Sequence, residues 1–271
     1  MNIIKRFWTA LVLLAALFAV LQYAGPWVTF LVIQAVILAA LIEFNNLARR
    51  RLLHPRTGPG IFLVLLLGAS FIIEGLTLEM ALFFGLLGVG LSYVIVSRTI
   101  EIAVRTTESI TVTLFGPVYI GFTLNFLYPL RETYGSVYIY FLLTVVFLAD
   151  TGAFFIGKAI GRHPMTPIAS PHKTWEGAAG GLLFAGLAAW AARAVFLPEI
   201  GLGQAIAAGL SVAIVAQISD PLESLFKRAA GVKDSSNALP GHGGFLDRID
   251  SLLFAVPFFY FLVRYLWKPA G

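Results

Sequence analysis

The sequence predicts an all-α, polytopic integral membrane protein, a helical bundle of about nine transmembrane helices. Apolar residues make up 59% of its 271 residues and charged residues only 12%, whereas roughly 25% charged residues is usual in soluble domains. The apolar residues are gathered into successive segments of roughly 20 residues, the length that crosses a bilayer. The basic residues lie mostly between these segments, as in proteins whose loops set their orientation.

Turn signals separate several of the predicted spans. Gly25 and Pro26 follow the first span, and Pro55 and Pro59 precede the third, as expected where Gly and Pro interrupt regular structure. The first span begins like a signal peptide, but further apolar segments follow at once, which indicates an uncleaved span. The division between the third and fourth spans rests on the short region 74–80. The predicted spans are residues 7–23, 27–43, 60–77, 81–97, 111–130, 136–156, 179–197, 202–219 and 251–267.

The distribution of basic residues predicts the orientation of the bundle. With the N-terminus in the cytoplasm, nearly all of the 19 Lys and Arg residues lie in inward-facing segments. This asymmetry follows the positive-inside rule and predicts, for nine spans, an N-in, C-out protein of the cytoplasmic (inner) membrane. Segments 157–178 and 220–250 then face the cytoplasm. The outward-facing segments would contain only Arg131, Arg193, Arg264 and Lys268.

Composition also excludes several kinds of function. The chain has no cysteine, so disulfides, thiolate metal sites and cysteine nucleophiles are excluded. A net charge of +5 would suggest nucleic acid for a soluble protein, but here the loop charges account for it, and we expect no nucleic-acid partner. The 26 glycines would allow close helix contacts between the protomers of a homodimer, and Asn125 is expected to make an interhelical hydrogen bond.

The polar residues that follow the eighth span are spaced as one helix face. Asp220, Glu223, Ser224 and Lys227 have i, i+3, i+4, i+7 spacing, which places them together on a helix. The alternative is a local helix cap, with Asp220 as the N-cap residue, Pro221 at the first helical position and Glu223 at the third. Capping explains Asp220 and Glu223 but not Lys227, and we prefer a functional Asp220 with capping as a compatible second role.

Asp247 and Asp250 form a second acidic pair, at the start of the last span. Two neighbouring carboxylates repel each other unless a cation lies between them. Mg²⁺ typically uses one or two carboxylates together with waters and substrate phosphates. With Asp220 at the end of an adjacent span, we favour a metal site over the alternative that these are interfacial charges at a helix start.

A glycine-rich turn, residues 240–244, leads into the last helix. Glycines let the backbone N–H groups approach a phosphate, and a helix N-terminus adds positive potential. Such a turn is more often a plain loop than a phosphate site. His242 within it is equally consistent with a phosphate donor and with a hydrogen-bonded structural histidine.

A further polar patch covers residues 150–177. Asp150 ends an apolar span, where an isolated carboxylate is costly and therefore needs a partner or a function. Ser170, Lys173 and Thr174 supply hydroxyls and an ammonium suited to phosphate oxygens. A solvated loop with a helix cap before Gly177 explains the same residues equally well. The glycines expected to pack closely against a neighbouring helix are Gly152, Gly157 and Gly161.

Together these segments resemble the signature of the phosphatidate cytidylyltransferase family, also called CDP-diacylglycerol synthases. That signature runs Ser-x-x-Lys-Arg, Lys-Asp, Leu-Pro-x-His-Gly-Gly and Asp-Arg-apolar-Asp. It is met without a gap by Ser224, Lys227, Arg228, Lys233, Asp234, Ser236, Leu239, Pro240, His242, Gly243, Gly244, Phe245, Asp247, Arg248, Ile249 and Asp250. The upstream elements of the family are similar at Asp150, Ala153, Phe154, Gly157, Gly161, Arg162, Ser170, Pro171, Lys173, Thr174, Glu176 and Gly177.

The resemblance covers the C-terminal half of the chain. We therefore expect residues 131–271 to carry the catalytic loops and residues 1–130, which match the family only in being apolar spans, to form a scaffold. The chain departs from the family at Ser219, where Gly is usual. The added hydroxymethyl group would either crowd the site or cap the helix.

The resemblance implies a membrane enzyme of phospholipid biosynthesis that converts CTP and phosphatidate to CDP-diacylglycerol and pyrophosphate. It also implies Mg²⁺, with a second cation, monovalent or divalent, as a further expectation. The chemistry of the residues agrees. A phosphate monoester is largely dianionic at pH 7 and needs no general base, so catalysis requires cations that screen the repulsion between two phosphates. CTP, phosphatidate and membrane lipids are the expected partners.

The residues that match the signature divide by role. The predicted metal ligands are Asp220, Asp247 and Asp250, and the predicted catalytic set adds Lys227 and Arg228. The predicted substrate-binding residues are Ser170, Lys173, Thr174, Ser224, Lys233, His242, Gly243, Gly244 and Arg248. Asp234 and Glu223 would orient the cations.

Two other functions fit a polytopic protein with this charge pattern. A related nucleotidyl- or phosphotransferase would act on another lipid, such as a polyprenol or an ether lipid. A transporter of phosphorylated solutes would place ionisable residues near the bilayer midplane. Here they gather on one face, which favours an enzyme at the membrane surface.

Overall fold

The computed structural model describes residues 3–96, 105–239, 241 and 243–267. In this part of the chain helices predominate, and one antiparallel sheet pairs β1 (Pro164–Thr166) with β2 (Ser170–Thr174). This confirms the predicted helical membrane class. The chain forms two compact units, unit 1 with Met1–Tyr128 and Ala229–Arg248, and unit 2 with Pro129–Arg228 and Ile249–Gly271.

Within the described residues, 7 helices are long and apolar enough to cross a membrane. The count of nine spans and the orientation stay predictions. The span expected at 60–77 is α3 (Thr57–Ala69), which ends at Ala69, where the Ser70 hydroxyl donates to the Leu67 carbonyl at 2.8 Å as the chain turns. The helical segments with this length and composition are Pro26–Arg50, Leu78–Val96, Thr106–Tyr134, Ser136–Ile160, Trp175–Phe196, Leu202–Ala229 and Leu246–Leu266.

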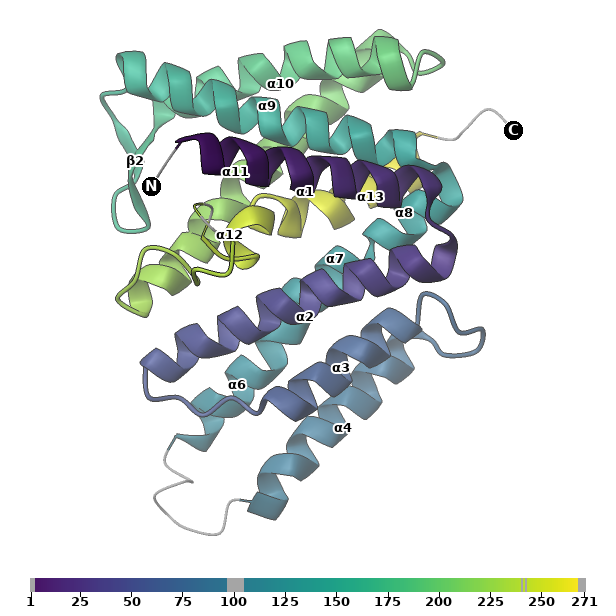
Figure 1. Cartoon of the computed structure of the whole chain (residues 1–271), viewed down its shortest axis with the longest axis vertical. Helices are drawn as coiled ribbons and strands as arrows, with labels where there is room; N and C mark the ends of the chain where they lie inside the picture. The colour runs from purple at the N-terminus through teal and green to yellow at the C-terminus, as the bar shows by residue number, and fades with distance from the viewer. Residues whose placement is uncertain (1–2, 97–104, 240, 242, 268–271) are drawn as a thin grey trace. The chain divides into compact units, whose positions relative to one another are not determined.

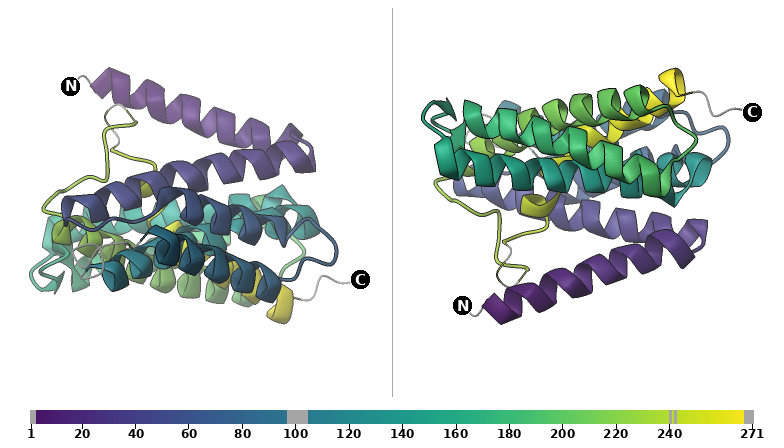
Figure 2. Two further views of the ribbon diagram at one scale, coloured as in Figure 1. Left: turned by 90° about the horizontal axis from the view of Figure 1, so that it is seen from below. Right: turned by 90° about the horizontal axis from the view of Figure 1, so that it is seen from above.

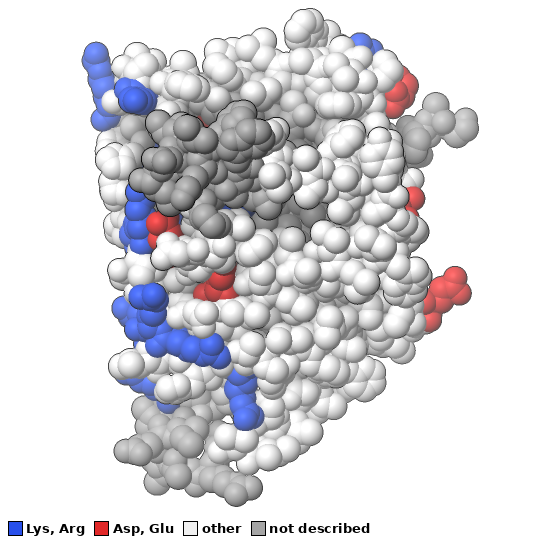
Figure 3. All heavy atoms as spheres, viewed as in Figure 1, with Lys and Arg blue, Asp and Glu red and all other residues white. Residues whose placement is uncertain are grey.

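Unit 1 begins with α1 (Ile3–Tyr23), α2 (Pro26–Arg50) and α3 (Figure 1). Pro26 starts α2 because its fixed φ suits the first helical position. Arg49 and Arg50 end it, where positive charge favours the helix C-terminus. Arg49 donates to the side chains of Asn46 and Thr57, and basic side chains gather at the edge where α2 ends (Figure 3).

The interior of unit 1 combines an apolar core with one buried amide pair. Leu63, Leu67 and Ala81 pack α3 against α4 (Leu78–Val96). Deeper along α2, Gln34 Nε2 donates to Asn125 Oδ1 at 2.6 Å, which confirms the predicted interhelical hydrogen bond. The remaining helical elements of the unit are α6 (Thr106–Gly116), the π-helix η1 (Pro117–Phe122), α7 (Thr123–Asn125) and the start of α8 (Leu127–Tyr134).

Unit 2 is built on two closely packed helices, α9 (Ser136–Ile160) and α10 (Trp175–Phe196), which lie side by side in Figures 1 and 2. A Cβ at Gly152 would overlap the Phe184 side chain, and one at Gly157 would lie 3.4 Å from the Gly177 Cα. Small residues bring helix backbones together in membranes, and the predicted close packing is confirmed for Gly152 and Gly157. A Cβ at Gly161 would meet the Gly157 carbonyl and Thr174 instead of a residue within α10. The unit also contains α11 (Leu202–Ala229) up to Arg228, and α13 (Leu252–Leu266). The short α12 (Leu246–Ile249) belongs to unit 1 except for its last residue.

The helix α11 continues well past the predicted end of its span. It runs unbroken through Asp220 and Pro221 to Ala229, so the alternative that Asp220 caps a new helix is wrong. Proline removes one backbone hydrogen bond, and a helix of this length tolerates that loss. The continuous helix carries Asp220, Glu223, Ser224 and Lys227 on one face, as their spacing predicts.

Candidate active site

Lys173 and Asp220 join the two polar segments of unit 2. Lys173 is on β2, directly before α10, and its Nζ lies 2.5 Å from Asp220 Oδ2 on α11, 47 residues away in sequence. One turn further along α11, the Ser224 hydroxyl approaches Asp220 Oδ1 at 3.4 Å. The structure therefore brings three predicted site residues together.

Two further carboxylates of unit 2 meet at Ser251. The Ser251 N–H donates to Asp250 Oδ1 at 2.7 Å, and its hydroxyl lies 3.2 Å from Asp150 Oδ2. Asp150, Asp220 and Asp250 are near enough for their charges to interact. We call Asp150, Lys173, Asp220, Asp250 and Ser251 the charged cluster. Asp150 and Ser251 are its additions to the predicted site.

Ser219, the departure from the family pattern, has a bonding role. Its side chain is fully buried, and its hydroxyl donates to the backbone carbonyl of Asp250. Neither expected outcome, crowding of the site or helix capping, describes this contact. The Ser219 hydroxyl instead links α11 to the backbone of Asp250.

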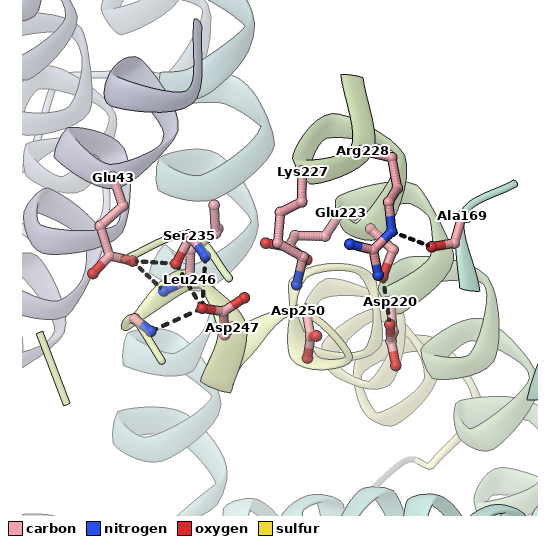
Figure 4. Close-up of polar contacts among 12 residues, drawn as sticks. Glu43, Ala169, Asp220, Glu223, Lys227, Arg228, Ser235, Leu246, Asp247 and Asp250 are labelled. Carbon is pink, nitrogen blue, oxygen red and sulfur yellow. Dashed lines mark hydrogen bonds and ion pairs between the residues drawn. The ribbon is translucent and has the colours of Figure 1, made fainter. Parts of the chain in front are cut away.

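Lys227 and Arg228 lie one turn beyond Ser224 on α11. Lys227 forms a buried ion pair with Glu223, whose side chain has no exposed surface. Arg228 is exposed, and its Nε donates to the Ala169 carbonyl at 3.3 Å (Figure 4). Glu223 orients Lys227 by this pair, and Arg228 is anchored to the hairpin that carries Lys173.

The charged cluster has the donor chemistry of a magnesium site. Its ligating atoms are carboxylate oxygens, which hard cations such as Mg²⁺ prefer. Among the described residues, no three His, Cys, Asp or Glu side chains lie close enough to form a complete metal cage. Mg²⁺ rarely uses an all-protein cage and usually keeps waters and substrate phosphates. Asp220 and Asp250 therefore fit a metal that arrives with a phosphate substrate.

In unit 1, Asp247 binds back to its own loop. Its Oδ2 accepts from the Ser235 N–H at 2.9 Å, the Ser235 hydroxyl at 2.8 Å and the Gly244 N–H at 2.8 Å. Asp247 lies in the first turn of α12, where negative charge is favourable. Its predicted place among the metal ligands stays a prediction.

Glu43 on α2 binds the same loop. Its Oε1 accepts from the Ser236 hydroxyl at 2.7 Å and the Phe245 N–H at 3.0 Å. Its Oε2 accepts from the Leu246 N–H at 2.9 Å and lies 2.9 Å from the Ser235 hydroxyl (Figure 4). This hydroxyl has a single hydrogen, which Glu43 shares with Asp247. Sequence analysis did not select Glu43, because these partners are 192 to 203 residues away. Its one sequence signal is a carboxylate at the end of an apolar span.

We call Glu43 and Asp247, with their donors, the loop clamp. In the loop between Ser236 and Gly244, Gly241 and Gly243 have positive φ values of 81° and 77°, which glycine adopts without strain. A Cβ on Gly244 would overlap the Ser235 hydroxyl and the Glu43 carboxylate. The fold therefore requires these glycines, and phosphate binding by Gly243 and Gly244 stays a prediction. His242 lies outside the described residues.

The remaining predicted substrate-binding residues are Ser170, Thr174, Lys233 and Arg248. Thr174 Oγ1 accepts from the Gly177 N–H at 3.1 Å, which confirms the predicted helix cap before Gly177. Ser170 begins β2. Lys233 and Arg248 are exposed, and their roles, like that of Ser170, stay predictions. Asp234, predicted to orient a cation, is also exposed, and its role stays a prediction.

The chain is similar to known proteins over most of its length. The sequence profile described as "Cytidylyltransferase family" matches residues 4–266. A protein of Bacillus subtilis named phosphatidate cytidylyltransferase is 32% identical over 257 residues, 93% of this chain and 94% of that protein. Proteins of the same name from Staphylococcus saprophyticus and Staphylococcus epidermidis are 41% and 38% identical over 53% of this chain and 55% of their own lengths.

Proposed function

Since the chain belongs to the cytidylyltransferase family, we propose that it transfers the cytidylyl group of CTP to phosphatidate. The products are CDP-diacylglycerol and pyrophosphate. The observation that carries the proposal is the ion pair between Lys173 and Asp220. It unites in one place the two segments whose residues suit phosphates, one with an ammonium and one with carboxylates.

The proposed reaction is a displacement at phosphorus. An oxygen of the phosphatidate phosphate attacks the α-phosphorus of CTP, a new P–O bond forms, and the bond to the β-phosphate oxygen breaks. Pyrophosphate leaves with that electron pair. The attacking phosphate is largely dianionic at pH 7, so no proton has to be removed by the protein. Catalysis then consists of holding two anionic groups together and stabilising the charge that reaches the leaving group.

Lys173 and Lys227 are suited to this task. An ammonium has three N–H donors, so Lys173 can keep its bond to Asp220 and still donate to phosphate oxygens. The pairing fixes the position of the Lys173 side chain before substrate arrives. Lys227 is fixed in the same way by Glu223. Such preorganised charge costs little reorganisation during the reaction.

We propose Mg²⁺ as the cofactor, held by Asp220 and Asp250. When bound, it would neutralise phosphate charge and favour departure of pyrophosphate. Asp247 as a third ligand, and a second cation, remain part of the proposal on the strength of the family resemblance. The proposed setting is the cytoplasmic face of the cytoplasmic membrane, because CTP is a cytoplasmic nucleotide and the basic loops favour that side. A homodimer is compatible with the glycine content.

The test uses the purified protein in detergent with labelled CTP, phosphatidate and MgCl₂, followed by lipid extraction. We expect label in the lipid fraction and one pyrophosphate released per lipid formed, with both absent when phosphatidate or Mg²⁺ is omitted. Transfer of label to a polyprenyl phosphate but not to phosphatidate would identify another lipid substrate. Absence of CTP consumption with any phospholipid acceptor would reject cytidylyl transfer.

A further inference from the structure

Glu43 belongs to the half of the chain that lacks the family signature, yet its side chain is bonded to the signature segment. It is 5% exposed and lies within hydrogen-bond distance of four donors in the loop 235–246, one of them shared with Asp247. A buried carboxylate is costly unless hydrogen bonds satisfy it. Here both oxygens of the side chain lie within hydrogen-bond distance of such donors.

The donors come from both ends of the loop. Ser235 and Ser236 stand at its beginning, and Phe245 and Leu246 stand at its end. Each Glu43 oxygen lies near one hydroxyl and accepts from one backbone N–H, so the carboxylate contacts both ends of this segment. Helix capping alone would account for the two N–H groups but not for the two serines.

Asp247 binds the same loop through Ser235 and Gly244. It takes the N–H of Gly244, while Glu43 takes those of Phe245 and Leu246. Three successive N–H groups at the start of α12 are therefore bonded to carboxylates. Two of these three N–H groups are bonded to a residue of α2, far away in the sequence.

We propose that Glu43 is a positioning residue, which holds the 235–246 loop in the shape that cytidylyl transfer requires. The inference rests on the proposed function. Glu43 is not assigned any contact with substrate, since its oxygens are engaged by the loop. Its effect on the reaction passes through the backbone that presents the glycine-rich turn.

The decisive variant is Glu43→Gln, which keeps the size of the side chain. The amide replaces one oxygen with an NH₂ group that faces a serine hydroxyl and a backbone N–H. The hydroxyl can rotate to accept, but the backbone N–H cannot. We expect kcat/KM to fall about 10- to 100-fold, and hydrogen exchange of the amides in 235–246 to accelerate about tenfold or more. Glu43→Asp, which keeps the charge, should recover part of both losses.

Glu74→Gln is the matched control, because Glu74 is an exposed carboxylate in the same unit and should leave both measurements unchanged. Turnover is expressed per folded molecule, judged by elution in detergent and by Tm. A merely structural role would lower Tm and leave the turnover of the folded fraction intact, and this would overturn the proposal. Unchanged exchange in Glu43→Gln would also overturn it. An inactive wild type would reject the proposed function, while the exchange measurement would still decide whether Glu43 orders the loop.

Discussion

The loop clamp of unit 1 and the charged cluster of unit 2 both contain buried or part-buried carboxylates, but the hydrogen-bond partners of these carboxylates differ. In the loop clamp, Glu43 and Asp247 accept from hydroxyl and backbone N–H groups of one loop. In the charged cluster, Asp220 meets the ammonium of Lys173, and Asp150 and Asp250 share Ser251. Backbone N–H groups fix a conformation, whereas a paired ammonium can also bind phosphate. The difference suggests that Glu43 shapes the protein, whereas Asp220 and Asp250 act on the substrates.

The largest effect is expected at the buried ion pair between Lys227 and Glu223. Lys227→Ala would leave Glu223 buried without its ammonium, which typically costs about 3–5 kcal/mol. We expect a lower Tm and lost activity. The double variant Glu223→Gln with Lys227→Met removes both charges, and should recover Tm but not turnover. Recovery of turnover as well would show that Lys227 acts only as the partner of Glu223.

Asp220→Asn tests whether the charged cluster is catalytic. Loss of one electrostatic contact in the transition state typically costs ~2.7 kcal/mol, so we expect turnover to fall about a hundredfold or more. Elution in detergent should not change, because α11 does not depend on Asp220 as a cap. Asp250→Asn should behave in the same way. Nearly normal turnover in Asp220→Asn would remove the charged cluster from the mechanism.

Gly244→Ala tests the packing of the loop clamp. The added methyl group would overlap the Ser235 hydroxyl and the Glu43 carboxylate, and overpacking of this kind typically costs roughly 1–3 kcal/mol. We expect a lower Tm together with faster proteolysis of the 235–246 loop. Gly90→Ala on α4 is the control, since a Cβ there would meet nothing within 4 Å. Equal behaviour of the two variants would mean that the loop relaxes without cost.

Lys173→Ala should give the smallest effect of the series. The substitution removes one phosphate donor and leaves Asp220 part-exposed to water, so we expect about a tenfold loss in kcat/KM for CTP, about 1.4 kcal/mol. Arg50→Ala removes an exposed charge at the end of α2 and should change kcat/KM little. Similar losses in the two variants would indicate a general effect of positive charge rather than a specific contact.

The sequence predicts the local part of this arrangement and misses the long-range part. The face shared by Asp220, Glu223, Ser224 and Lys227 follows from helical spacing, and the packing of α9 on α10 follows from small residues. The capping alternative for Asp220 was wrong because a long spanning helix tolerates Pro221.

Glu43 could not be selected from one sequence. Its partners lie at the far end of the chain, and the donors Phe245 and Leu246 contribute backbone N–H groups that no side-chain pattern reveals. Ser251 was missed for a related reason. A serine at the start of an apolar helix is common, and its place between Asp150 and Asp250 depends on how α9 and α13 pack.

Cation binding tests the contrast between the two sets most directly. Mn²⁺ serves as a paramagnetic substitute for Mg²⁺, and its affinity is measured by electron paramagnetic resonance with CTP present in the wild type, Asp250→Asn and Glu43→Gln. We expect Asp250→Asn to weaken Mn²⁺ binding about tenfold or more, about 1.4 kcal/mol, and Glu43→Gln to leave it nearly unchanged. Strong loss in Glu43→Gln with normal binding in Asp250→Asn would contradict the account.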